Sequence, residues 1–342
     1  MRRRVRCAIA GCGMVAEEYA QTLRSSRAIN LVTCADIDVA RARAFARRYS
    51  IPRVVSPGQL DADVVIVLTP PEHHADVARS AIEAGMSVYL EKPLARTASE
   101  AESLLALADR RGVLIGAAPD TFLAPPIQAA AEAITAGLIG EPIAATAALL
   151  SPGPERWHPR PEPIYDLGPL LDMGPYYLTA LIHLLGPIAT VHGAICGSRP
   201  RRTRPSGAEF TTTTATHVEA LLETAAGVSI TLTTSFDTQA TTRPHLEIYG
   251  TDGTLVLPDP NFHEGTVRIR RQGENDWSAL TPKMPGFEVV GRGMGVLDLI
   301  NGPRRASGET ALHLLHVIEA VQRTSVSNSG SAVPAIWRAG QR

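Results

Sequence analysis

The sequence predicts an α/β protein with two domains: an N-terminal domain built on a parallel sheet and a C-terminal α/β domain rich in strands. A glycine-rich turn follows the first apolar strand, strands alternate with helices as far as about residue 120, and β-rich segments dominate later. A length of 342 residues is also too great for one comfortable core. We therefore expect domains of residues 1–120 and 121–342.

The composition is that of a soluble globular protein, with 44% hydrophobic and 20% charged residues. A net charge of -1 provides no general attraction to nucleic acid or to an anionic membrane. No window approaches the ~18 apolar residues of a membrane span. The segment Val5–Ala10 contains Arg6 and runs into glycines, which is typical of a strand and not of a signal sequence. We expect a cytoplasmic protein without nucleic-acid or membrane partners.

The cysteines and histidines do not form a metal-binding pattern. His73 and His74 are adjacent, so their side chains point apart, and no carboxylate has ligand spacing. The four cysteines are scattered and lack paired spacing, which favours free thiols: Cys7, Cys12, Cys34 and Cys196. We expect no metal site.

The first strand and its turn predict a nucleotide site. Strand Val5–Ala10 enters Gly11-Cys12-Gly13-Met14-Val15-Ala16, and Glu17–Ser25 is predicted to be helical. In this G-x-G-x-x-A turn the first glycine permits the tight bend, and the second lets the backbone approach a pyrophosphate. Ala16 allows close packing of helix on strand. The phosphates would lie at the helix N-terminus, where free N–H groups and the helix dipole favour negative charge.

The second strand, Leu31–Ala35, ends at Asp36, at about the ~20-residue distance where an acidic residue meets the adenosine ribose. Its carboxylate would accept hydrogen bonds from both ribose hydroxyls and would repel a 2′-phosphate. Ile37 stands where a phosphate site would prefer arginine, so NAD is favoured over NADP. Arg41 and Arg43 leave NADP open, although both are equally compatible with exposed helix positions.

The alternation continues through helix Val39–Tyr49 and strand Val64–Leu68 to Thr69 and Pro70. Ligands bind at the carboxyl ends of parallel strands, so these two residues are candidates for the cofactor site. Helix Ala75–Ala84 and strand Met86–Leu90 then lead to Lys92 in the tripeptide Glu91-Lys92-Pro93.

Together these motifs resemble the Gfo/Idh/MocA oxidoreductase family in order and spacing: G-x-G-x-x-A, Asp36, Thr69-Pro70 with His74, Ala84-Gly85, and Glu91-Lys92-Pro93. Asp172-Met173-Gly174-Pro175-Tyr176 resembles the family's second active-site motif, in which some members have tyrosine in place of histidine. Arg305-Ala306-Ser307-Gly308-Glu309 resembles its carboxyl-terminal region. The resemblance covers nearly the whole chain.

This resemblance implies a Rossmann domain that binds NAD(P), followed by an α/β domain with a large, mostly antiparallel sheet. Such sheets often form oligomer interfaces, so we expect a homodimer or homotetramer. The family's substrates are usually sugars, cyclitols and related polyols. The residues expected at the cofactor are Gly11, Cys12, Gly13, Met14, Val15, Asp36, Ile37, Thr69, Pro70, His74, Glu91, Lys92 and Pro93.

The second domain is also predicted from its own residues. Runs Thr212–Thr224 and Val228–Phe236 are rich in β formers, and Leu246–Tyr249 with Thr254–Leu257 flank a Gly-Thr-Asp-Gly turn. Two further segments complete a plausible sheet: Pro142–Leu150 and Thr190–Cys196.

The proton-transfer chemistry is expected from Lys92, Tyr176 and Asp172. Pro175 fits the first turn of a helix, and Asp172 and Tyr176 are four residues apart, so both project from one side of its start. Free tyrosine has a pKa of ~10, and a nearby ammonium lowers it. We expect Tyr176 as the acid/base, Lys92 as its electrostatic partner, and Asp172 as the residue that orients Lys92 or a substrate hydroxyl. The alternative is that Asp172 caps the helix and Tyr176 packs on the sheet.

Two regions depart from the family pattern. The loop Asp166–Leu171 before Asp172 is shorter and stiffer than the glycine-rich segment common in relatives. Asp120, within Ala118–Phe122, is a candidate for hydrogen bonding a polyol, and Trp157 with His158 for a sugar platform. For these three residues an ordinary loop position explains the sequence equally well.

We therefore expect an NAD(P)-dependent dehydrogenase or reductase that transfers hydride between nicotinamide and a hydroxyl or carbonyl carbon of a sugar, cyclitol or similar substrate. Two alternatives remain. One is an NAD-dependent glycosidase or lyase that uses transient oxidation and elimination, and the other is a non-enzymatic ligand sensor with the same fold. Retention of Lys92 and Tyr176 argues against the sensor.

Overall fold

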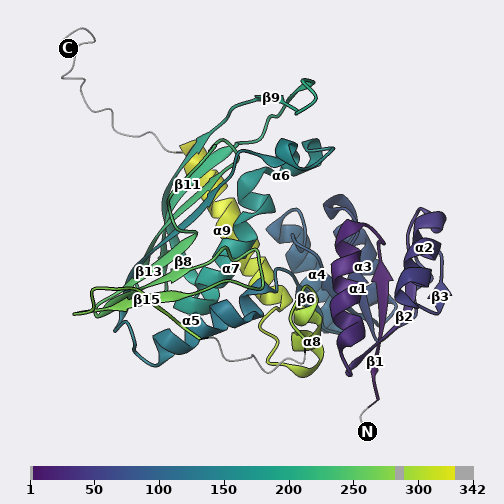
Figure 1. Cartoon of the computed structure of the whole chain (residues 1–342). Helices are drawn as coiled ribbons and strands as arrows, with labels where there is room; N and C mark the ends of the chain where they lie inside the picture. Colours follow the sequence, from purple (N-terminus) through teal and green to yellow (C-terminus); the bar gives the residue numbers. More distant parts are fainter. Residues whose placement is uncertain (1–2, 282–288, 328–342) are drawn as a thin grey trace.

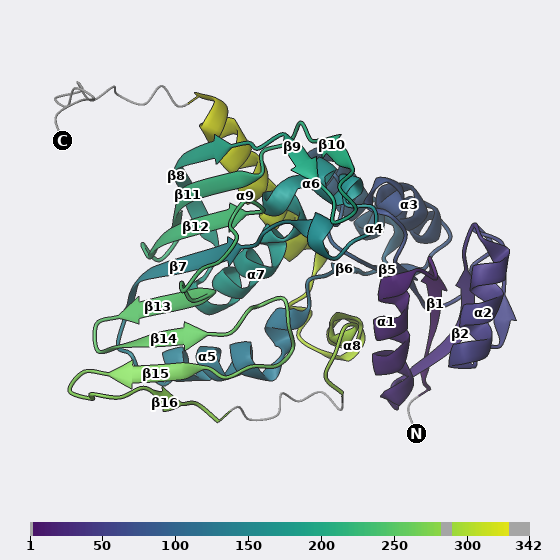
Figure 2. The same cartoon turned by 45° about the horizontal axis from the view of Figure 1, so that its top comes forward.

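The computed structural model describes residues 3–281 and 289–327, and the statements below concern these residues. Two sheets dominate the molecule, with helices between them (Figure 1). The first sheet has six strands in the order β3-β2-β1-β4-β5-β6, all parallel. The second has eight strands in the order β16-β15-β14-β13-β7-β12-β11-β8, which Figure 2 shows side by side. The predicted fold class is confirmed.

The N-terminal half alternates strands and helices as predicted. Its strands are β1 (Val5–Ala10), β2 (Ile29–Ala35), β3 (Arg53–Val54), β4 (Val64–Val67), β5 (Ser87–Leu90) and β6 (Ile115–Ala117). Its helices are α1 (Met14–Ser25), α2 (Val39–Tyr49), α3 (His74–Glu83) and α4 (Ala98–Arg111). The four residues of β4 are all buried, as expected for a central parallel strand covered on both faces.

The C-terminal half contains the second sheet and most of the remaining helices. Its strands are β7 (Pro142–Leu150), β8 (Ile188–Gly197), β11 (His217–Thr224), β12 (Ser229–Ser235), β13 (Leu246–Gly250), β14 (Gly253–Leu257), β15 (Arg268–Arg271) and β16 (Ser278–Ala279). A small hairpin adds β9 (Arg201–Thr203) and β10 (Glu209–Thr211). The helices are α5 (Pro125–Thr135), α6 (Glu162–Asp172), α7 (Gly174–Leu185), α8 (Met294–Asn301) and α9 (Gly308–Ser327). Only β7 and β12 pair in parallel in the large sheet, so the expected mostly antiparallel sheet is confirmed.

The large sheet has one covered face and one open face. Helices α5, α6, α7 and α9 pack against the covered face, between the two sheets (Figure 1). Alternate residues of β11 follow this division: Val218, Ala220 and Leu222 are buried, whereas Glu219 and Leu221 are exposed. The open face therefore carries apolar side chains that the described chain does not cover.

The segment before Asp172 differs from the expected loop. It is helical in α6, which is kinked at Gly168, where φ is 70° and ψ is 168°. A Cβ at Gly168 would lie 2.8 Å from the Thr214 side chain, so the kink brings the backbone close to its neighbour. Asp172 consequently ends one helix, and Tyr176 lies in the first turn of the next.

The chain returns to the first sheet near its C-terminal end. Ser307 forms a bridge with Gly116 of β6, and the Ala117 N–H donates to the carbonyl of Ala306. Helix α9 then packs on α4 and β6 as well as on β8. The division at residue 120 stays a prediction. Among the described helices, none is long and apolar enough to cross a membrane.

Candidate active site at the carboxyl end of the parallel sheet

The glycine turn between β1 and α1 has the geometry that a pyrophosphate site requires. Gly11 has a φ of +94°, and a Cβ there would lie 2.6 Å from the Leu68 carbonyl oxygen, so only glycine fits. A Cβ at Gly13 would meet nothing within 4 Å, so the space beside this residue is open. No side chain caps the N-terminus of α1, whose N–H groups stay available to an anion. Cys12 is buried, whereas Met14 is 74% exposed and Val15 is half-buried.

Asp36 follows β2 and is tied to the glycine turn. One carboxylate oxygen accepts from the Cys12 N–H at 2.8 Å, and the other accepts from the Asp38 N–H at 2.8 Å. Arg41 lies 3.5 Å from the second oxygen. Ile37 is 90% exposed and adds no charge at this position. The carboxylate is therefore fixed at the strand end where an adenosine ribose is expected.

His74 joins the loops that follow β4 and β5. Its Nδ1 lies 2.7 Å from the Pro93 carbonyl oxygen, and its Nε2 lies 2.8 Å from the Thr69 carbonyl oxygen. The ring is 1% exposed, so both nitrogens are used inside the protein, whereas His73 is exposed. The side chain therefore positions Thr69 and Pro93, and a direct contact between His74 and the cofactor stays a prediction. Pro70 lies exposed beside them.

Lys92 lies against Asp172 at the end of β5. Its Nζ is 2.6 Å from Asp172 Oδ1 and 2.6 Å from the Asp172 carbonyl oxygen. Burial by itself would lower the pKa of Lys92, but the charge of Asp172, together with Tyr176 and Glu91, raises it above its ordinary value. Lys92 is therefore an ammonium at neutral pH. The peptide bond between Lys92 and Pro93 is cis.

Glu91, the first residue of the tripeptide, is buried and points into the protein. It accepts hydrogen bonds from the Tyr19 hydroxyl at 3.1 Å and from the Lys92 N–H at 2.8 Å. Arg292 Nη1 lies 3.6 Å from the same carboxylate. Glu91 thus fixes the backbone that presents Lys92, in addition to any role at the cofactor.

Tyr176 completes the cluster from α7. The Lys92 ammonium lies 5.6 Å from its ring centroid, and Arg292 Nη1 donates to its hydroxyl at 3.0 Å. Burial raises the pKa of Tyr176, and this outweighs the opposing effects of Lys92 and Arg292. Lys92 therefore has the expected lowering effect on the pKa of Tyr176, but the net shift is upward because the ring is almost fully buried.

Asp120 makes its contacts inside the protein. Its side chain is 1% exposed, and Oδ2 accepts from the N–H groups of Gly293 at 2.8 Å and Gly295 at 3.0 Å. Burial would raise the pKa of Asp120, but His263 at 3.6 Å and the two N–H groups hold it below its ordinary value. This carboxylate anchors the turn that carries Arg292, and a hydrogen bond between Asp120 and substrate stays a prediction.

Trp157 and His158 lie on the segment between β7 and α6. Trp157 is 67% exposed, and its ring stacks edge-on to His158 at a centroid distance of 5.3 Å. His158 Nδ1 lies 2.6 Å from the Arg160 carbonyl oxygen. The sugar-platform role of this pair stays a prediction.

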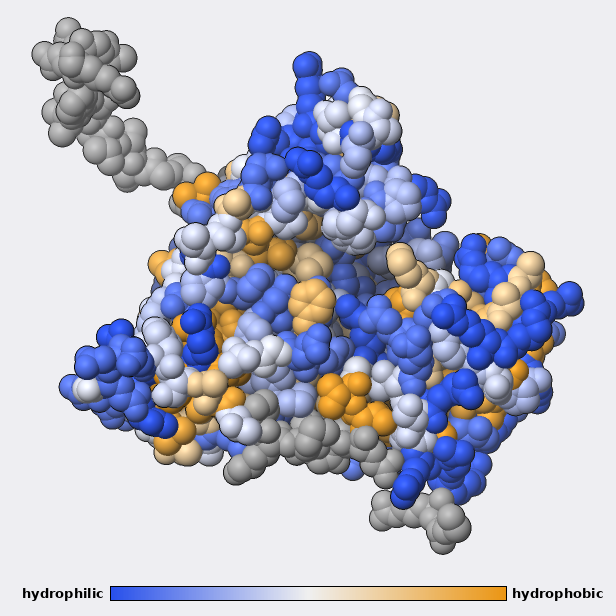
Figure 3. All heavy atoms as spheres, in the orientation of Figure 1, coloured by the Kyte–Doolittle hydropathy of each residue, from blue (hydrophilic) through white to orange (hydrophobic). Residues whose placement is uncertain are grey.

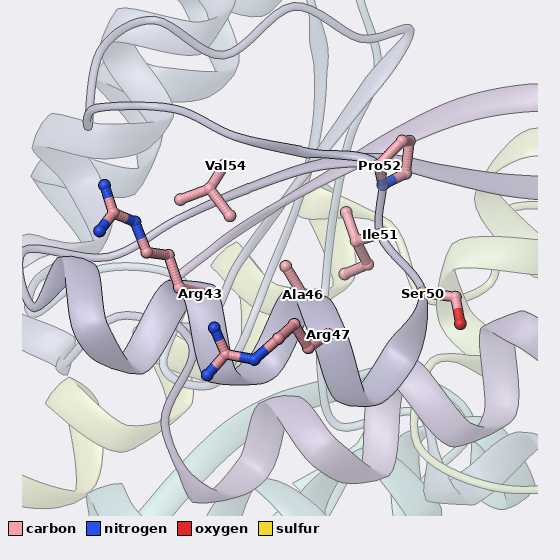
Figure 4. Close-up of a pocket in the computed structure, with 7 residues that line it drawn as sticks. All are labelled: Arg43, Ala46, Arg47, Ser50, Ile51, Pro52 and Val54. Atoms are coloured by element: carbon pink, nitrogen blue, oxygen red, sulfur yellow. The ribbon is translucent and has the colours of Figure 1, made fainter.

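The surface is recessed between the part that contains α6 and the part that contains α1, as the view in Figure 3 shows. Asp172 is the last residue of α6, and Lys92 follows β5 of the parallel sheet. A separate surface pocket of ≈ 460 Å³ lies between α2 and β3 (Figure 4). Arg43 and Arg47 line it, and it includes none of the residues expected at the cofactor or in catalysis.

Comparison with known proteins identifies the family. A model described as "Oxidoreductase family, NAD-binding Rossmann fold" matches residues 5–118, and the "GFO/IDH/MocA C-terminal domain" model matches residues 127–256. The chain belongs to the Gfo/Idh/MocA family. It is therefore an NAD(P)-dependent oxidoreductase, as the resemblance implied.

Relatives agree over most of the length. A dTDP-3,4-didehydro-2,6-dideoxy-alpha-D-glucose 3-reductase from Streptomyces antibioticus is 30% identical over 83% of this chain and 84% of the relative. A 3-ketoreductase from Actinomadura kijaniata, solved with NADP and TDP-benzene, has a TM-score of 0.74 at 24% identity and covers 94% of this chain and 98% of its own. Levoglucosan dehydrogenase in complex with NADH has a TM-score of 0.77 at 18% identity, covering 95% and 97%. These two structures support the fold.

The residues present fit the family's cofactor. The open space beside Gly13, the uncapped start of α1 and the fixed Asp36 carboxylate suit a pyrophosphate and a ribose. The buried Thr69 hydroxyl has no hydrogen-bond partner within the described chain, which leaves it available to a bound group. Arg292 was not expected from the sequence. Its only local signal is the Gly291-Arg292-Gly293 turn before an apolar helix.

Proposed function

We propose that this oxidoreductase acts on a hydroxyl or carbonyl carbon of a sugar or sugar-like substrate, with Lys92, Tyr176 and Asp172 at the reacting centre. The observation that carries the proposal is the convergence of these side chains at the end of β5. Lys92 Nζ lies 2.6 Å from Asp172 and 5.6 Å from the Tyr176 ring centroid. A proton donor and a fixed cation beside it are what a carbonyl oxygen needs as it becomes a hydroxyl.

When bound, the nicotinamide supplies or accepts the hydride. For reduction, the neutral Tyr176 hydroxyl gives its proton to the substrate oxygen, while Lys92 hydrogen-bonds that oxygen and stabilises its developing negative charge. For oxidation, the ionised tyrosine takes the proton from the substrate hydroxyl. Asp172 acts through Lys92, because both of its oxygen contacts hold the ammonium in place.

The sugar class is supported by the relatives. The Streptomyces antibioticus relative is named for a keto sugar carried on a nucleotide, and an Escherichia coli relative, 30% identical over 53% of this chain and 54% of its own length, is a D-glucoside 3-dehydrogenase. NAD is the cofactor we favour over NADP, because the Asp36 carboxylate stands where a 2′-phosphate would add a second negative charge. Arg41, 3.5 Å from Asp36, keeps NADP possible.

The test is hydride transfer measured with NADH and NADPH against panels of keto sugars, free sugars and nucleotide-linked sugars. We expect activity with at least one sugar class, a kcat loss of about 100-fold or more in Tyr176→Phe, and a similar loss in Lys92→Ala. Tyr249→Phe, on β13, is the matched control and should leave kcat unchanged. Failure of every sugar panel would overturn the substrate assignment.

The same assay separates net redox from the elimination alternative. Product that accumulates without net change in NADH would support transient oxidation followed by elimination. Stoichiometric use of NADH would support the dehydrogenase or reductase. Family membership already favours an enzyme over a ligand sensor.

We also propose that the open face of the large sheet joins copies of this chain as a homodimer or homotetramer. Ile195 on β8 and Leu221 on β11 are 67% and 47% exposed, and they lie on the same face because Ile195 pairs with Glu219. Sedimentation should show an oligomer that Leu221→Glu weakens. Ile143→Glu, at the start of β7 and 55% exposed, is the control and should not weaken it. A cytoplasmic location stays a prediction, which cell fractionation can check.

A further inference from the structure

Arg292 is the residue that contacts the proposed acid/base most directly. Its Nη1 donates to the Tyr176 hydroxyl at 3.0 Å, and its guanidinium carbon lies 5.7 Å from the Tyr176 ring centroid. The side chain is only 16% exposed, so little water screens its charge. Of the described cations, Arg292 is the one hydrogen-bonded to this hydroxyl, whereas Lys92 lies over the ring.

The chain holds Arg292 in a defined place. Gly291 and Gly293 on either side have φ values of +147° and +103°, which suit glycine. The buried Asp120 carboxylate accepts hydrogen bonds from the N–H groups of Gly293 and Gly295, and these two bonds fix the backbone of the turn. Arg292 Nε also pairs with Glu18 of α1 at 2.9 Å. The guanidinium thus connects the nucleotide-binding half with α7.

We propose that Arg292 is a positioning residue that orients the Tyr176 hydroxyl and stabilises its ionised form during proton transfer. The charged groups facing Tyr176 are Lys92 and Glu91 from the end of β5 and Arg292 from the turn before α8. Glu91 disfavours the ionised tyrosine, and Lys92 alone would have to offset both this carboxylate and burial. Arg292 supplies the second positive charge.

An experiment independent of activity tests the coupling. A fluorinated tyrosine, which ionises at lower pH than tyrosine, is incorporated at position 176 of the full chain and titrated by fluorine NMR. We expect Arg292→Gln, which keeps a donor but removes the charge, to move this titration to higher pH. Arg292→Lys should move it less. Arg47→Gln, an exposed arginine in the α2 pocket, is the control and should not move it.

The kinetic arm rests on the proposed sugar oxidoreductase activity. In the oxidation direction, below the tyrosine pKa, the rate follows the fraction of ionised Tyr176, so Arg292→Gln should lower kcat about tenfold at each pH, with KM changed less than about threefold. Arg292→Lys should recover most of this loss. The proposal would be overturned if Arg292→Gln left the titration of the tyrosine at position 176 unchanged, or if this variant changed KM but not kcat. Absence of sugar activity with a shifted titration would count against the proposed function alone.

Discussion

The Lys92 ammonium is bound by two oxygens of Asp172, the carboxylate Oδ1 and the backbone carbonyl, each at 2.6 Å and 80 residues further along the chain. Asp172 therefore neutralises the charge of Lys92 and also fixes the orientation of its ammonium group. The carbonyl contact depends on the position of Asp172 at the end of α6. The kink at Gly168 and the start of α7 thus help to place a side chain that belongs to the other half of the molecule.

Asp172→Asn should change the pH dependence of activity. Burial lowers the pKa of Lys92, and the Asp172 charge is what raises it, so removal of this charge lowers the pKa. Lys92 then loses its proton at lower pH. We expect the alkaline decline of kcat/KM to begin at about tenfold higher proton concentration, that is at lower pH, than in the unaltered enzyme. Profiles of kcat/KM against pH measure this. Asp61→Asn, which removes an exposed carboxylate, is the control, and coincident profiles for Asp172→Asn would contradict the prediction.

The same ion pair contributes to stability over a defined pH window. The folded-state pKa of Lys92 is above its ordinary value of ~10.4, so the contribution is fully present below that value. It is lost as pH rises through the folded-state pKa. The difference in the free energy of unfolding between the native chain and Lys92→Met should therefore be constant from neutral to mildly alkaline pH, as urea titrations can measure. A difference that vanishes near neutrality would contradict this.

Gly11→Ala and Gly13→Ala should separate folding from cofactor binding. A Cβ at Gly11 would lie 2.6 Å from a backbone carbonyl at a φ of +94°, so we expect a loss of about 1–3 kcal/mol in the free energy of unfolding. Gly13 has a φ of -77° and open space around it, so its alanine variant should fold normally. That variant should nevertheless bind NADH at least about tenfold more weakly, because the methyl group enters the space where the pyrophosphate approaches. Thermal unfolding and fluorescence titration distinguish the two effects, and equal effects of both variants on stability would contradict the interpretation.

Asp36→Asn should reduce discrimination between the two cofactors. Asparagine keeps one oxygen acceptor for the Cys12 N–H but removes the charge that repels a 2′-phosphate. We expect NADPH to bind about tenfold more tightly, while NADH binding weakens by less than about tenfold through loss of a charge-assisted hydrogen bond. Dissociation constants from calorimetry test this. An unchanged ratio of NADH to NADPH affinity would show that Arg41 already governs the choice.

His74→Gln and His73→Gln should behave differently although the residues are adjacent. Each His74 nitrogen lies within hydrogen-bond distance of a carbonyl oxygen, and glutamine cannot reproduce this bridge, so we expect a loss of about 1–3 kcal/mol in the free energy of unfolding. The loops that carry Thr69 and Pro93 should then hold the cofactor less tightly. His73 is exposed, and its substitution should change neither Tm nor cofactor affinity. A larger effect at His73 would sink this assignment.

Local sequence patterns predicted those helices and strands whose bounds depend on neighbouring residues. Helix Val39–Tyr49 and strand Pro142–Leu150 have the predicted bounds, because apolar residues at helical spacing mark the helix and turn residues flank the apolar run of the strand. The run Thr212–Thr224 begins as a strand only at His217, since β propensity alone does not mark where pairing starts. The segment before Asp172 contains Gly168 and Pro169, which suggested a loop, yet packing makes it a kinked helix.

The candidate site was predictable only in part for the same reason. The association of Lys92 with Asp172 and Tyr176 followed from spaced motifs, but the Arg292 contact joins residues 116 positions apart and has no motif of its own. Asp120 was expected to face substrate because it follows a strand end. Its actual partners, Gly293 and Gly295, lie more than 170 residues away, where sequence spacing carries no information.

The bridge between Gly116 and Ser307 adds to the edge of the parallel sheet a segment that is synthesised after the strands of the large sheet. During translation, β6 presents an unpaired edge until residue 307 has left the ribosome, and α4 lacks the cover that α9 later provides. A fragment that ends near residue 120 would keep this edge exposed and would tend to self-associate. A chimera that takes its nucleotide-binding half from a relative therefore has to take residues 306–327 from the same relative.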